Sequence, residues 1–152
     1  QQPGVQPVQL GPTLAKRLLP LPGGAAPDRV LGAAPLGVLL PRAHPLASRT
    51  TLGLPDLAAE PYIALDETTV IRGVIDAALA RHGASLRRVH GVSTGAAAYR
   101  LVAAGLGFTF ADRVALDPRL LGDVTLVPWD VEARVEVGVF RLSGVDDGRT
   151  AA

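Results

Sequence analysis

The sequence has 152 residues, of which 48% are hydrophobic and 19% are charged, and its formal net charge is +1 at pH 7. This composition can form a sizeable core in one domain or in two small lobes, which excludes a wholly disordered chain. The arginines form no clustered basic stripe, which argues against strong binding to a phosphate backbone, and the lack of cysteine excludes a thiolate zinc site.

The longest apolar run lies near residues 30–40, where Gly32, Pro35 and Gly37 interrupt it. It is too short to span a bilayer, which needs about 20 apolar residues. The first nine residues lack the basic start and the apolar stretch of a signal peptide. We therefore expect a soluble, cytoplasmic protein that does not interact with membranes.

Residues 1–35 form the least regular part of the chain. Repeated prolines and the pair Gly23-Gly24 leave room for one short helix over residues 13–19. We interpret this part as a linker or as an irregular remnant of a larger fold.

A regular pattern begins at residue 36. The apolar run 36–40 predicts a buried strand, residues 54–59 a helical turn, and residues 62–65 a second strand. Apolar residues at helical spacing then predict a helix over residues 70–82, and Gly83 is suited to a left-handed cap at its end.

The second half of the chain continues this alternation. We expect strands at residues 88–92, 108–110, 124–128 and 134–141, a helix at 95–104 and a short helix at 112–115. Strands that alternate with helices predict βαβ units and a mostly parallel sheet. The loops that follow parallel strands lie at one edge of such a sheet, where ligands bind.

Two polar loops are expected at that edge. One contains Asp66, Thr68 and Thr69, and the other contains Ser93 and Thr94. Serine, threonine and aspartate are favoured as helix caps for backbone reasons alone. Exposed N–H groups at the start of a helix also suit an anionic ligand, and one hydroxyl can serve both purposes.

The sequence predicts no metal, cofactor or catalytic residue. His44, His82 and His90 share no metal-ligand spacing, and we expect His44 to order a turn. The glycines of residues 105–107 follow a helix and do not open one, so they do not form a dinucleotide loop. The adjacent acids at residues 66–67 lack a partner nucleophile, so we predict that the protein is not an enzyme.

The chain contains, in this order, LGVLLPRAHPLA, LPDLAAEPYIAL, IDAALARHG, a strand that ends in Ser-Thr, and YRLVAAGLGFTF. Over residues 36–142 these five segments resemble effector-binding domains of LysR-type transcriptional regulators, in which they occur in the same order. The resemblance implies an α/β fold like that of type 2 periplasmic binding proteins, with two lobes joined by crossover strands. It implies a crossover strand at 36–47, a second lobe at 48–107, a return crossover with closing strands of the first lobe at 108–142, and a tail at 143–152.

The first lobe departs from the family pattern. The winged helix-turn-helix, its linker helix and the usual first strand and helix have no counterpart in this sequence, although Pro3-Gly4-Val5 resembles the segment that follows that helix. The interval before residue 36 is also shorter than in the family. Either the first lobe is reduced or residues are missing there; we expect missing residues and an incomplete lobe.

The resemblance also implies a function. The chain would bind a small organic metabolite, polar or anionic, between its lobes, and it would control DNA through a domain absent from this chain, as a homodimer or tetramer. The effector-binding candidates are Ser93, Thr94, Thr68, Thr69, Asp66, Phe108 and Thr109. Core packing is the alternative for Phe108, and a solute-binding component of a transport system is the alternative for the protein.

Overall fold

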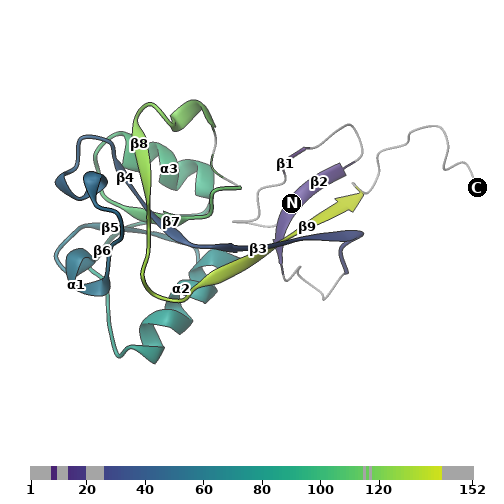
Figure 1. The fold of residues 1–152 in the computed structure, drawn as a ribbon, viewed down its shortest axis with the longest axis horizontal. Helices are drawn as coiled ribbons and strands as arrows, with labels where there is room; N and C mark the ends of the chain where they lie inside the picture. Colours follow the sequence, from purple (N-terminus) through teal and green to yellow (C-terminus); the bar gives the residue numbers. More distant parts are fainter. Residues whose placement is uncertain (1–7, 10–13, 20–25, 115, 117, 142–152) are drawn as a thin grey trace, which may run out of the picture.

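The computed structural model describes residues 8–9, 14–19, 26–114, 116 and 118–141. Figure 1 shows a body that contains the helices and a sheet that extends away from it along β2, β3 and β9. The expected tail at 143–152 and the segment at residues 3–5 lie outside the described residues.

The body is built on strands β4 (Gly37–Pro41), β5 (Tyr62–Leu65), β6 (Arg88–Val92), β7 (Thr109–Ala111) and β8 (Val124–Pro128). Strand β5 pairs with β6 in parallel, and β4 pairs antiparallel with both β7 and β8. A parallel bridge between Tyr62 and Phe108 joins the two groups, and the Ile63 N–H donates to the Phe108 carbonyl at 2.8 Å. The strands therefore follow the order β6-β5-β7-β4-β8.

The prediction of a mostly parallel sheet is right only in part: β5 is parallel to β6 and to the segment at Phe108, whereas β4 is antiparallel to both of its neighbours, and the extended sheet described below is antiparallel. Strand β4 runs against its neighbours because the chain reverses direction between β4 and β5, through the 3-10 helix η2 (Pro45–Ser48) and helix α1 (Leu54–Leu57). The antiparallel pairs follow from how the chain enters and leaves this lobe, and that path is not encoded in the alternation of strands and helices.

The two longer helices agree with their sequence signals. Helix α2 (Val70–Arg81) connects β5 to β6, and helix α3 (Gly95–Ala103) follows β6. Gly83 has a φ of +58°, as a left-handed cap requires. Helix α3 packs on β4, β5 and β7, whereas α2 contacts β5 and β9. The largest fully buried side chains come mainly from the strands and from these helices: Leu39, Ile63, Ile75, Val102, Phe108 and Phe110.

The extended sheet consists of β1 (Val8–Gln9), β2 (Leu14–Leu19), β9 (Arg134–Arg141) and β3 (Arg29–Pro35), in that order and all antiparallel. In its described residues this sheet contains no helix. The short helix predicted over residues 13–19 is a strand in its described part, residues 14–19, which pairs with β9 from Leu14↔Arg141 to Leu19↔Glu136. A segment bounded by prolines is too short to nucleate a stable helix, so pairing with a distant strand determines its structure.

Two crossover segments connect the sheets and lie side by side. Strand β3 leads almost directly into β4, and the residues between β8 and β9 run back beside it, where the Leu36 N–H donates to the Ala133 carbonyl at 2.8 Å. A body of strands and helices that is joined by two crossover segments to a second sheet agrees with the predicted α/β fold class. The helix expected at 112–115 is absent from its described part: Arg113 and Val114 form a turn, in which the Val114 N–H donates to Asp112 at 2.9 Å.

Candidate functional site

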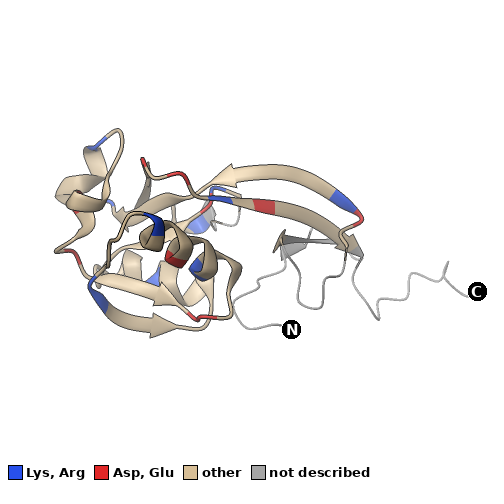
Figure 2. Cartoon of the chain, turned by 90° about the horizontal axis from the view of Figure 1, so that it is seen from below, with Lys and Arg blue, Asp and Glu red and all other residues tan. Residues whose placement is uncertain are grey.

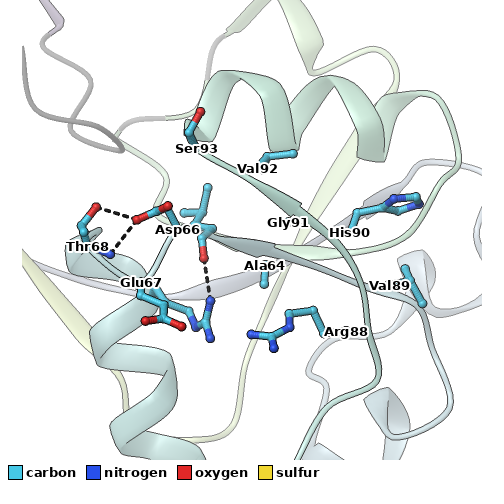
Figure 3. A pocket seen from close by; sticks show the side chains of 12 residues that line it. Ala64, Asp66, Glu67, Thr68, Arg88, Val89, His90, Gly91, Val92 and Ser93 are labelled. Carbon is cyan, nitrogen blue, oxygen red and sulfur yellow. Dashed lines mark hydrogen bonds between the residues drawn. The ribbon is translucent and has the colours of Figure 1, made fainter.

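A pocket of about 770 Å³ opens along strand β6, and the loop after β5 and the start of the loop after β6 line one end of it. Ala64, Leu65, Asp66, Glu67, Thr68, Arg72, Arg88, Val89, His90, Gly91, Val92 and Ser93 line it (Figure 3). Because β5 and β6 are parallel, their carboxyl ends bring the two predicted polar loops to the same edge.

The first loop is ordered by Asp66. The backbone N–H of Thr68 donates to Asp66 Oδ1 at 2.9 Å, and the Thr68 hydroxyl donates to the same oxygen at 2.7 Å (Figure 3). These two hydrogen bonds hold the pKa of Asp66 below its ordinary value of 3.8, and the bond from the Thr68 backbone has the larger effect. The carboxylate is therefore charged at neutral pH, and the loop is organised without a ligand.

Thr69 and Thr94 cap the two helices that begin near the pocket. The Arg72 N–H donates to the Thr69 hydroxyl oxygen at 3.1 Å, and the Ala97 N–H donates to that of Thr94 at 3.1 Å. Neither side chain lines the pocket. They fix the starts of α2 and α3, whose positive dipole ends favour negative charge nearby.

Phe108 and Thr109 lie in the core between β5 and β7. The Thr109 hydroxyl donates to the Ile63 carbonyl at 2.8 Å, and the ring of Phe108 stacks on Tyr62 with centroids 5.3 Å apart. Both residues are almost fully buried and do not line the pocket. Among the predicted site residues, the pocket thus brings together Asp66, Thr68 and Ser93.

Sequence reasoning did not select the two arginines of the pocket. Arg72 Nη1 donates to the Leu65 carbonyl at 2.8 Å, and Arg72 Nε contacts Asp76 Oδ2 at 2.9 Å. Its spacing of four residues from Asp76 is a signal that the sequence contains. Arg88 is the first residue of β6 and lines the pocket. Its direction depends on a shift in the register between β5 and β6, which local sequence does not reveal.

His44 orders a turn, as expected. Its Nδ1 accepts from the Leu46 N–H at 3.0 Å, and its Nε2 is bonded to Glu60 Oε1. Because Nδ1 is the acceptor, the proton of the neutral ring lies on Nε2 and is donated to the glutamate. The pair joins the first crossover turn to the segment before β5.

Charged side chains are dispersed over the described elements, and Figure 2 shows no stripe of Lys and Arg along one of them. Within the described residues, no group of three or more His, Asp or Glu side chains could hold a metal ion. None of the described helices is long and apolar enough to cross a membrane.

Comparisons with known proteins identify a family and a fold. The LysR substrate binding domain model matches residues 14–146. No curated protein sequence matches the chain.

Several solved structures share the fold. The Synechocystis PCC6803 CcmR regulatory domain in complex with 2-PG is 21% identical, with a TM-score of 0.64 over 88% of this chain and 65% of its own. The effector binding domain of QuiR in complex with shikimate is 20% identical, with a TM-score of 0.59 over 86% and 58%. HinK, a LysR family transcriptional regulator from Pseudomonas aeruginosa, is 16% identical, with a TM-score of 0.60 over 90% and 44%. This chain thus spans less than two thirds of each of these proteins.

Proposed function

The chain belongs to the LysR substrate binding domain family, and on that premise we propose that it senses a small-molecule effector for a bacterial LysR-type transcriptional regulator. The observation that supports this proposal is the pocket in which the loops after β5 and β6 meet. In α/β folds, ligands bind at the carboxyl ends of parallel strands, and one end of the pocket occupies that position.

We propose that the effector is a small, polar or anionic organic metabolite that contacts Thr68, Ser93 and the backbone around Asp66. Thr69 and Thr94 would contribute by holding the N–H groups at the starts of α2 and α3. Phe108 and Thr109 would support β5 from the core. The CcmR and QuiR domains were solved with 2-PG and shikimate, so these two molecules are the first probes to test.

Effector binding would act on the rest of the regulator through the two crossover segments. A ligand shifts a conformational equilibrium only by its different affinity for the two states. We propose that the effector changes how the second lobe is placed relative to the extended sheet, and thereby the geometry of a cytoplasmic homodimer or tetramer. DNA would be bound by a helix-turn-helix domain outside this chain, and catalysis is not part of the proposal.

Calorimetry on two pocket variants tests the site. Thr68→Ala and Ser93→Ala each remove one hydroxyl that lines the pocket, and we expect the double variant to bind an identified effector at least tenfold more weakly. The matched controls are Thr51→Ala and Ser85→Ala, because these residues are exposed and lie outside the pocket. Equal affinity of the two double variants would show that the effector binds elsewhere.

Solute binding for a transport system is the second candidate because the fold class is shared. Membership in a family of regulator domains favours the sensing function over transport. The reading frame upstream of this chain discriminates between them: a helix-turn-helix domain supports the regulator, and an export signal supports the transporter.

A further inference from the structure

Strand β6 contains a β-bulge where it lines the pocket. Arg88 pairs with Tyr62 and His90 pairs with Ile63, so two residues of β6 correspond to one step of β5. A bulge breaks the alternation of side chains along a strand and redirects one of them. Figure 3 shows that Arg88 extends toward the side of the pocket where Glu67 lies, whereas His90 points away from it.

Arg88 lines the same pocket as Arg72. Burial raises the pKa of Tyr62 to about 12, and the nearby charges of Arg72 and Arg88 both act in the opposite direction. Both guanidinium charges therefore act on the same buried tyrosine, and both side chains line the same pocket.

The two arginines differ in their partners. Arg72 is held by Asp76 and by the Leu65 carbonyl. The Arg88 side chain makes no hydrogen bond or ion pair with the part of the chain that the structure describes. A guanidinium that makes no ion pair and shares a pocket with a second guanidinium can gain a strong interaction with a bound acid group.

We propose that Arg88 recognises a carboxylate or phosphate group of the effector. Its planar guanidinium presents paired N–H donors that match the two oxygens of such a group. Because Arg88 begins β6 and Ser93 follows its end, the ligand would lie along the strand with its acid group toward Arg88. This inference rests on the proposed function of the pocket and adds the class of ligand and its orientation.

Glu67 provides an opposing charge. It lines the same pocket, and Figure 3 shows its carboxylate on the side toward which Arg88 extends. An acid group bound at Arg88 would be repelled by Glu67. Removing this carboxylate should therefore strengthen anion binding, whereas removing the Arg88 guanidinium should weaken it.

Nuclear magnetic resonance titrations of the 152-residue chain test the proposal. The probes are benzoate, its neutral analogue benzamide, and inorganic phosphate, all at constant ionic strength. The variants are Arg88→Gln, Glu67→Gln and the matched control Arg87→Gln, because Arg87 lies outside the pocket and donates to the Ala59 carbonyl at 3.1 Å. All three side chains are exposed, so none of these changes removes a packed group.

We expect benzoate or phosphate to shift the Arg88 side-chain signal and the amide signals of β6. The affinity should fall at least tenfold in Arg88→Gln, rise severalfold in Glu67→Gln and stay unchanged in Arg87→Gln, while benzamide shows no dependence on Arg88. A response to benzoate alone identifies a carboxylate, and a response to phosphate alone identifies a phosphate.

Two results would overturn the role of Arg88. One is equal anion affinity in Arg88→Gln and Arg87→Gln, and the other is no shift at Arg88 with either anion. If the anions still shift Thr68 and Ser93 equally in both variants, the pocket and the proposed function stand without Arg88. If Arg88 responds and Thr68 and Ser93 do not, Arg88 binds anions, but the proposed position of the effector is wrong.

Discussion

Replacing Gly107 by alanine would place a methyl group inside the junction of β5 and β7. Gly107 has a φ of +155°, and a Cβ built on it would lie 2.5 Å from the Pro61 carbonyl oxygen and 3.2 Å from Ile63 Cγ1. That carbonyl also accepts the Phe108 N–H at 2.9 Å. The clash can be relieved only if the Pro61 carbonyl moves away from residues 107 and 108. That movement also breaks or strains the hydrogen bond from the Phe108 N–H.

The expected cost follows from those two terms. Overpacking costs about 1–3 kcal/mol and a lost backbone hydrogen bond about 1 kcal/mol, so Gly107→Ala should lower the free energy of unfolding by about 2–4 kcal/mol beyond the strain of its positive φ. This is a large part of the roughly 5–15 kcal/mol that stabilises a typical domain. Urea unfolding measures it through the fluorescence of Trp129, the single tryptophan of the chain, which is 7% exposed in the fold.

Gly105 provides the matched control. It has a φ of +84°, but a Cβ there would meet no atom within 4 Å. Gly105→Ala therefore carries only the cost of a left-handed backbone, about 1–2 kcal/mol. If Gly107→Ala proves no more destabilising than Gly105→Ala, the close approach of Pro61 does not constrain residue 107 and the reasoning is refuted.

Three further predictions concern single groups. Gly73 lies within α2 and a Cβ there would meet no atom within 4 Å, so Gly73→Ala should stabilise the fold by about 0.5–1 kcal/mol in the same urea assay, and a loss of stability would contradict this. Thr68→Ala removes one of the two hydrogen bonds to Asp66, so carboxyl resonances should show the pKa of Asp66 rising only part of the way to 3.8. Because the pKa of Asp66 is lowered in the fold, its charged form stabilises the fold at pH values above 3.8. This stabilisation is lost as the pH falls through the lowered pKa. Burial raises the pKa of Tyr62 to about 12 and also raises that of Tyr99, so the two tyrosines of the chain should show almost no phenolate absorbance at pH 10 while it is folded. Since the unfolded state loses these protons near pH 10, stability should fall as pH rises from 10 toward 12, and ionisation of the folded chain at pH 10 would disprove the burial.

Helices α2 and α3 could be predicted because their signals are local. Thr69 and Thr94 precede apolar residues at helical spacing, and both hydroxyls cap the helices in the structure. The meeting of the two loops at one edge also followed from the sequence, because it requires only that β5 and β6 are parallel.

Strand β2 and the role of Arg88 could not be predicted, because both depend on pairing between distant segments. Leu14 lies opposite Arg141 at the other end of the chain, and no local pattern encodes that partner. The bulge that redirects Arg88 exists only relative to Tyr62 and Ile63. A sequence pattern identifies a strand, but the direction of each side chain depends on a register that only the fold defines.

Helix α2 connects the pocket to the return crossover, and this connection gives a last prediction. Its first turn contains Arg72, which lines the pocket, and at its last turn Arg81 donates to the Glu132 carbonyl at 2.6 Å, between β8 and β9. Figure 1 shows the helix beside this segment, and α2 also contacts β9. A 12-residue helix spans about 18 Å as a rigid rod, so a shift of its start can be transmitted to its end.

Arg81→Ala removes the bond at the far end of α2 and leaves every residue of the pocket in place. We expect effector affinity to change less than twofold, while effector-induced protection of the amides after Glu132 from hydrogen exchange is lost. The control is Arg100→Ala, because Arg100 is an exposed arginine on α3 and contributes nothing to the pocket. Position between two sites does not by itself establish coupling. Coupling through α2 requires that the protection of β9 on effector binding depends on Arg81. Protection that persists in Arg81→Ala would show that the effector acts on the extended sheet by another path.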